Sequence, residues 1–396
     1  MSPLEDRTKV LIAGVCGLTL MLGIARFAYT PLLPLMQTQA GLDANYGAWL
    51  ASINYFGYLA GALIAASISD MALKDRLYRI GIILAVVTTL AMALTTDWRL
   101  WAMARFFAGL SSAAGLLLGS GLILNWLMRH HYRSELGIHF SGLGLGILVS
   151  ALLVELMSPY FDWQSQWVWL SLLGVALALP AWLWLPPPKN SGFTISGNAL
   201  DDHPPSQLFL RIFMVAYFCA GAGYVVSATF IVAIIDDMPG LSDSGNFVFL
   251  IVGLAATPAC ILWDRFARHS GSFNALIVAS VFQTIGIALP LFSATLWSAI
   301  TSAILFGATF IGIVSLVLTM AGRYYPSHPS KMMGKMTFSY GIAQIAAPAA
   351  IAVTIQSDGN YNQGLYLAAG AMVIGTAILV LLRFIEEKHA SPNQLG

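Results

Sequence analysis

Two arginines, Arg26 and Arg105, lie inside long apolar segments of the sequence. Arg26 belongs to the run 10–36, which at about 1.5 Å rise per residue is long enough to cross a hydrocarbon core of about 30 Å. A guanidinium at that depth costs at least about 2.5 kcal/mol on insertion scales and keeps its proton, so it requires a cavity or a partner. We interpret Arg26 as a cation that faces an anionic solute. The alternative is a structural arginine, satisfied by carbonyls that Pro31 and Pro34 free from helical hydrogen bonds.

Arg105 is the second candidate for binding an anion, and Glu155 offers it an ion-pair partner as the alternative. Glu155 is the only carboxylate that we place inside a predicted span, and His139 lies near the inner end of the same span. Proton relays in transporters use buried acids and histidines, so Glu155 and His139 are the candidates for carrying a coupled proton. For His139 the alternative is a histidine packed near a helix end.

Neutral polar side chains inside predicted spans complete the candidate binding site. Their positions four residues apart place Asn54 with Tyr58, and Tyr340 with Gln344, on common helix faces. Tyr224 lies on a further span. We predict that these five residues bind substrate together with Arg26 and Arg105. Their alternative role is hydrogen bonding between helices, worth about 0.6 kcal/mol per contact in membrane proteins.

The composition restricts the class of protein. Of the 396 residues, 58% are hydrophobic and 9% are charged, against roughly 25% charged in an ordinary soluble domain. This is the composition of a membrane protein, and the net charge of +1 gives no basis for binding nucleic acid. The three cysteines are far apart, with no CxxC spacing and no neighbouring histidines, so we expect neither disulfides nor a metal site. No catalytic motif is found, and we expect no enzyme and no cofactor.

Twelve apolar runs are long enough to be transmembrane helices, and they predict an all-α integral membrane protein. A polar, proline-rich stretch separates the first six runs from the last six. We therefore predict an N-terminal half at 1–186, a cytoplasmic linker at 187–206 and a C-terminal half at 207–396. The predicted spans are 9–36, 45–69, 78–96, 98–127, 134–157, 164–186, 207–235, 245–263, 272–293, 296–322, 332–356 and 363–384.

The charges of the loops predict the orientation of these spans, because cytoplasmic loops concentrate Lys and Arg. With the N-terminus inside, every Lys and Arg falls in an inside segment except Arg26, Arg99 and Arg105. Both termini are then cytoplasmic, and Asn360 lies in an external loop.

The two halves repeat some features at corresponding places. The second span ends at Asp70 and the eighth at Asp264, Arg265 and Arg268, which we interpret as turns that gate the inside surface. Such internal symmetry is typical of duplicated six-helix halves, with a binding site between them near the bilayer midplane.

These features resemble the major facilitator superfamily over the whole chain. The resemblance rests on the six-plus-six layout, on the acidic and basic turn at 264–268, and on 105–109, which is similar to the RxxxG motif of that family. Residues 23–34, 334–340 and 344–348 resemble the YbfB/YjiJ-type branch more narrowly. That resemblance implies a transporter of the bacterial inner membrane. The turn after Asp70 departs from the pattern, since it lacks the usual adjacent basic residue and glycine.

The expected function is secondary active transport of a small organic solute by alternating access. The buried arginines favour an organic anion, either a monocarboxylate or an aromatic acid, whose transport could be coupled to protons. The alternative is a multidrug or metabolite efflux transporter for amphipathic compounds. We expect a monomer whose partners are a small-molecule substrate and the lipid bilayer.

Overall fold

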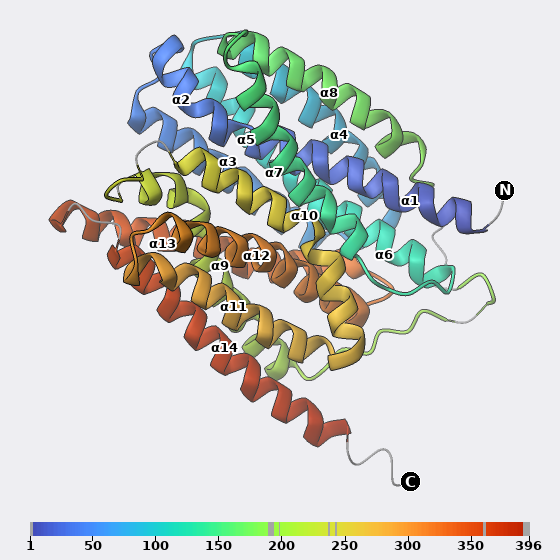
Figure 1. Cartoon of the computed structure of the whole chain (residues 1–396). Helices are drawn as coiled ribbons and strands as arrows, with labels where there is room; N and C mark the ends of the chain where they lie inside the picture. Colours follow the sequence, from blue (N-terminus) through green and yellow to red (C-terminus); the bar gives the residue numbers. More distant parts are fainter. Residues whose placement is uncertain are drawn as a thin grey trace.

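The computed structural model describes residues 3–188, 194–197, 199–236, 238–241, 244–358 and 362–390, and within them all side chains except those of 3–5, 44–45, 48, 229–230, 232–233, 236, 347–358 and 386–390. The described chain is a bundle of helices (Figure 1). Up to the linker these are α1 (Pro3–Leu18), η1 (Thr19–Phe27), α2 (Tyr29–Ala40), α3 (Ala44–Ser67), α4 (Met71–Ala93), α5 (Trp98–Ala113), η2 (Ala114–Gly119), α6 (Ser120–Arg129), α7 (Gly137–Met157) and α8 (Trp163–Leu183). After the linker come α9 (Gln207–Asp236), α10 (Gly245–Ser270), α11 (Ser272–Phe292), α12 (Leu296–Tyr324), α13 (Pro329–Asp358) and α14 (Asn362–Ala390).

The helices confirm the prediction of an all-α membrane protein. Among the described residues, 11 helical segments are long and apolar enough to cross a membrane, and each coincides with a predicted span. The remaining predicted span, 332–356, is occupied by α13, a helix of 30 residues. The N-terminal segments α1, η1 and α2 together form one span, as do α5, η2 and α6.

Aspartate side chains cap the N-termini of two helices near predicted span ends. Asp70 accepts hydrogen bonds from the main-chain N–H groups of Ala72 and Leu73 at the start of α4. Asp162 does the same for Ser165 at the start of α8, which lowers the pKa of this exposed carboxyl. Side-chain acceptors at these positions satisfy N–H groups that have no partner inside the helix.

Helices α1 to α8 form the upper part of the bundle in Figure 1, and α9 to α14 form the lower part, with the beginning of α1 and the end of α14 at the same end of the bundle. In the linker, the Ile195 N–H donates to the Arg129 carbonyl, and the His203 N–H donates to the Tyr324 carbonyl. Residues 189–193 and 198 of the linker, and Asn360, lie outside the described residues. The domain boundaries and the orientation in the membrane stay predictions.

Two π-helical segments, η1 and η2, interrupt spans of the first half. In η1 the Ala28 N–H donates to the Gly23 carbonyl, five residues earlier, so this turn is wider than an α-helical turn. Side chains from other helices bind carbonyls of this segment: Ser112 donates to Met21 and Ser150 donates to Gly23. Single π-helical turns occur often at functional sites, and η1 is the segment that carries Arg26.

Two helix pairs make most of the contacts between the helices before the linker and those after it: α7 with α10, and α3 with α13. Glycines allow their main chains to approach closely. A Cβ on Gly144 would lie 2.6 Å from the carbonyl carbon of Ala256, and a Cβ on Gly334 would lie 2.6 Å from the nitrogen of Ala66. These two contacts, which we call the seams, set the position of the candidate site.

Candidate functional site

Arg26 lies near the end of η1, and its side chain is almost fully enclosed, with 6% of the residue exposed. Its guanidinium carbon is 4.6 Å from the ring centroid of Tyr58, 4.7 Å from that of Tyr55 and 5.3 Å from that of Phe27. The Tyr55 side chain also interacts electrostatically with it. Among the described residues no carboxylate forms an ion pair with Arg26. The cation is therefore stabilised by aromatic faces without being neutralised.

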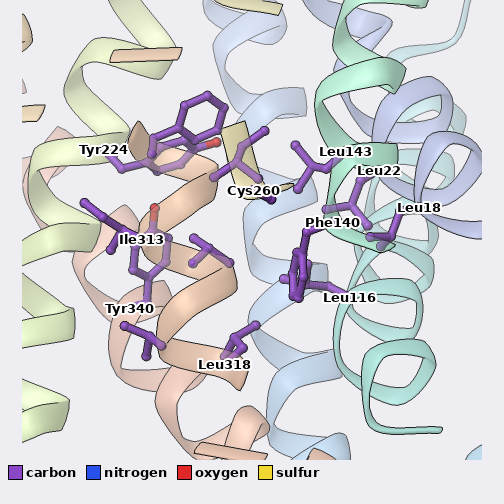
Figure 2. Close-up of a cluster of buried hydrophobic side chains, with 14 of the residues drawn as sticks. Leu18, Leu22, Leu116, Phe140, Leu143, Tyr224, Cys260, Ile313, Leu318 and Tyr340 are labelled. Carbon is purple, nitrogen blue, oxygen red and sulfur yellow. The ribbon is translucent and has the colours of Figure 1, made fainter. Parts of the chain in front are cut away.

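Helices from the other side of the linker also contribute to this site. Tyr224 on α9 is close enough to Arg26 for direct electrostatic interaction, and its ring centroid is 5.6 Å from that of Tyr340 on α13. Figure 2 shows the hydroxyl of Tyr340 directed toward Tyr224. The structure thus brings together four of the predicted site residues, and we call Arg26, Tyr55, Tyr58, Tyr224 and Tyr340 the Arg26 cluster.

Arg105 makes contacts of a different kind. Its Nη1 donates to the carbonyl of Ala25 at 3.0 Å and its Nη2 donates to the carbonyl of Arg26 at 3.3 Å. Its guanidinium carbon lies 4.5 Å from the ring centroid of Tyr29. Asn54 in turn donates to the Arg105 carbonyl at 2.8 Å. Arg105 therefore holds the main chain at the end of η1, and Asn54 joins α3 to α5.

The ion pair between Arg105 and Glu155 is not formed among the described contacts. Glu155 is exposed on α7, whereas Arg105 is 3% exposed and bonded to the main chain of η1. The sequence places both side chains near the outer ends of their spans, but it does not show that Glu155 points away from the interior of the bundle.

His139 and Gln344 are both buried. The Nε2 of His139 is 2.8 Å from the Ser120 hydroxyl, and a Cβ on Gly14 would lie only 2.4 Å from its Nδ1. His139 on α7 is thus packed against α1 and α6. Gln344 is 4% exposed on α13, one helical turn beyond Tyr340, and its Oε1 has no hydrogen-bond partner in the described structure.

Two of the predicted gating residues, Asp264 and Arg268, lie where α7 begins, at one end of the seam between α7 and α10. The carboxylate of Asp264 accepts a hydrogen bond from the Gly137 N–H at 2.6 Å, at the first residue of α7. Arg268 forms a salt bridge with Glu135. The Nε of Arg323 donates to the Ser134 carbonyl at 2.8 Å. Three contacts thus join the two parts of the bundle at one point.

The other predicted gating residues do not take part in these contacts. Arg265 is exposed on α10, and Asp70 caps α4. Near Asp70, the Lys331 ammonium donates to the Ser69 hydroxyl at 3.4 Å across the seam between α3 and α13. Burial, and next the nearby Lys74, lower the pKa of His328 in the loop before α13, so this imidazole is neutral at pH 7.

Sequence reasoning did not select several residues that the structure places at these sites. Glu135, Ser134 and Arg323 were only loop or span-end residues in the sequence, and nothing in their spacing indicates a contact across the bundle. Among the described residues no cluster of three or more His, Cys, Asp or Glu could hold a metal ion.

Comparison with known proteins identifies the family. Residues 18–380 match the model of the family described as "Uncharacterised MFS-type transporter YbfB". The MFS-type transporter YceJ of Bacillus subtilis (strain 168) is 24% identical over 282 residues, which are 69% of this chain and 70% of that protein. The efflux pump radE of Floropilus chiversii is 24% identical over 42% of this chain and 30% of its own length.

The fold is also found among solved structures. The crystal structure of the human organic anion transporter MFSD10 (TETRAN) superposes with a TM-score of 0.74 at 14% identity, and the match covers 96% of this chain and 100% of that chain. This likeness shows the fold. Because the family model covers nearly the whole chain, the protein belongs to the YbfB-type family of major facilitator superfamily transporters.

Proposed function

We propose that this transporter moves a small organic anion, a monocarboxylate or an aromatic acid, by alternating access, and that Arg26 binds its carboxylate. The observation that carries the proposal is the contact set of Arg26, a buried cation with aromatic neighbours and no carboxylate partner among the described residues. Buried charges are ordinarily paired. An anionic substrate would supply the missing charge.

The chemistry of the guanidinium supports this assignment. Its planar fork presents parallel N–H donors that match the two oxygens of a carboxylate. The hydroxyls of the surrounding tyrosines are further donors. Arg105 supports the site without using the Arg26 side chain, because it binds the carbonyls of Ala25 and Arg26.

Alternating access requires contacts that break when the inside face opens. We assign this role to Asp264 and Arg268, whose partners Gly137 and Glu135 lie on the other side of the seam. Asp70 and Arg265 have no such contact in the described structure, and in this proposal they shape the turns. The proposal places the protein in the inner membrane of a bacterium, as a monomer with both termini in the cytoplasm.

Proton coupling has no candidate within the Arg26 cluster. His139 is packed against Gly14 and Ser120, and Glu155 is exposed. In this proposal neither residue carries a proton to the substrate, and charge complementarity at Arg26 accounts for binding.

The alternative function is efflux of amphipathic compounds. It is supported by the similarity to the efflux pump radE and by the aromatic character of the cluster. A lipophilic cation would, however, be repelled by Arg26. A thermal-shift screen separates the two functions, since a ligand that binds only the folded protein raises its melting temperature. Stabilisation by lipophilic cations and by no carboxylate would favour efflux.

The decisive variant is Arg26→Lys, which keeps the charge but removes the fork. We expect the purified variant to melt near the wild-type temperature, because an ammonium can keep its contacts with the aromatic rings. Its affinity for the carboxylate should fall about tenfold to a hundredfold, the scale of about 1 to 3 kcal/mol for a charged hydrogen bond. Binding and melting temperature are measured on the same sample.

Arg99→Lys is the matched control, since Arg99 is exposed near the start of α5. This variant should bind and melt as the wild type does. An Arg26→Lys protein that binds carboxylates normally would rule out direct contact. If it also melted earlier, Arg26 would be a structural residue.

A further inference from the structure

Four aromatic rings of the second half pack together, and two of them belong to the Arg26 cluster. They are Tyr224 on α9, Phe306 and Phe310 on α12, and Tyr340 on α13, and we call them the aromatic wall. The ring centroids of Phe306 and Phe310 are 5.0 Å apart with an interplanar angle of 12°. The Tyr224 centroid is 5.3 Å from that of Phe310 at 26° and 6.3 Å from that of Phe306 at 14°, so the three centroids form a triangle. Three rings are therefore nearly parallel.

This arrangement differs from that of the other aromatic cluster on α9. There, Phe209 and Phe213 meet Phe273 of α11 at interplanar angles of 83° and 49°. In edge-to-face and tilted pairs the ring faces point in different directions. In parallel rings the faces share one direction, so a planar ligand ring can stack on them. The wall also lies at the junction of the two parts of the bundle, because Tyr224 interacts electrostatically with Arg26.

Resting on the proposed function, we infer that the substrate is an aromatic acid whose carboxylate binds Arg26 while its ring stacks on the aromatic wall. In such an acid the charge and the ring are joined closely, so their binding groups must be neighbours. Tyr55 connects the two groups, because its ring centroid is 4.7 Å from the guanidinium carbon of Arg26 and its side chain interacts electrostatically with Tyr224. One molecule would then contact α9 of the second half and η1 of the first, and its binding would be linked to their approach.

The test compares pairs of acids that differ only in aromaticity: benzoate with cyclohexanecarboxylate, and phenylacetate with cyclohexylacetate. Affinity is measured by calorimetry on the purified full-length protein. An aromatic pair contributes beyond its buried area, so the aromatic member of each pair should bind about twofold to tenfold more tightly. Phe310→Leu keeps an apolar side chain without a ring face, and it should reduce this ratio toward one.

Phe213→Leu is the matched control, because Phe213 is equally buried in the other cluster, and it should keep the wild-type ratio. Phe306→Leu replaces Phe310→Leu if the latter fails to fold. Equal binding of aromatic and saturated acids by the wild type would overturn this inference and leave the proposed function standing. Stabilisation by lipophilic cations, with none by any acid, would overturn both.

Discussion

At the scale of the residue, the two buried arginines show how identical side chains acquire different roles. Arg105 donates to two main-chain carbonyls, whereas Arg26 is surrounded by aromatic rings. Both Nη atoms of Arg105 are thus engaged by main-chain acceptors. In the proposed function, Arg26 is therefore the binding group and Arg105 the residue that positions it.

Arg105→Met should test this positioning role. The substitution leaves the carbonyls of Ala25 and Arg26 without their side-chain donor, and an unsatisfied buried group costs about 1 to 3 kcal/mol. We expect a lower melting temperature, together with weaker binding of carboxylates because η1 is displaced. Arg99→Met on the same helix is the control. If Arg105→Met melted as the wild type does, the carbonyls would have other donors.

At the scale of the element, η1 is held by a close crossing with α7. A Cβ on Gly23 would lie 2.3 Å from the Cα of Gly146, and real side chains do not approach so closely. Thr19 donates to the Gly142 carbonyl on the same side of α7. The two helices are thus in main-chain contact directly before the turn that carries Arg26.

Gly23→Ala should therefore separate η1 from α7. Overpacking of this kind costs typically about 1 to 3 kcal/mol, and the shift should also disturb the Arg26 cluster. Thermal melting and carboxylate affinity are the measurements. Gly370→Ala on α14 is the control, because nothing lies within 4 Å of its added Cβ. That variant should be neutral or slightly more stable, since alanine favours the helix. Equal melting of both variants would contradict the close crossing.

At the scale of the whole molecule, contacts where α7 begins, at one end of one seam, help to hold the two parts of the bundle together. Asp264 binds the first N–H group of α7, where the helix dipole favours a negative charge. Arg268 and Glu135 add an ion pair. Because Arg268 is partly exposed, this pair is expected to shift the balance between conformations only slightly.

Charge reversal should reveal that shift. Arg268→Glu places two carboxylates together, and their repulsion should increase the labelling of a cysteine introduced at this end of the seam. The double variant that also carries Glu135→Arg should restore the wild-type level of labelling. The control is the pair of Arg79 and Asp75, which lies within α4, so its reversal should leave labelling unchanged. No rescue in the double variant would mean that the pair of Arg268 and Glu135 does not control opening.

The sequence by itself determined the spans, because their lengths and low charge suit a hydrocarbon core and leave few other solutions. It also located a cation within the bilayer at Arg26 and the acidic and basic turn at Asp264. The tertiary structure decided which arginine is bonded to main-chain carbonyls and which is surrounded by aromatic rings. That depends on the π-helical turn of η1, whose carbonyls are bound by Arg105, and on the burial of Tyr55 and Tyr58 against the guanidinium. It also decided the partners of Arg268 and Tyr224, since these come from segments more than a hundred residues away, and no local period relates such distant positions.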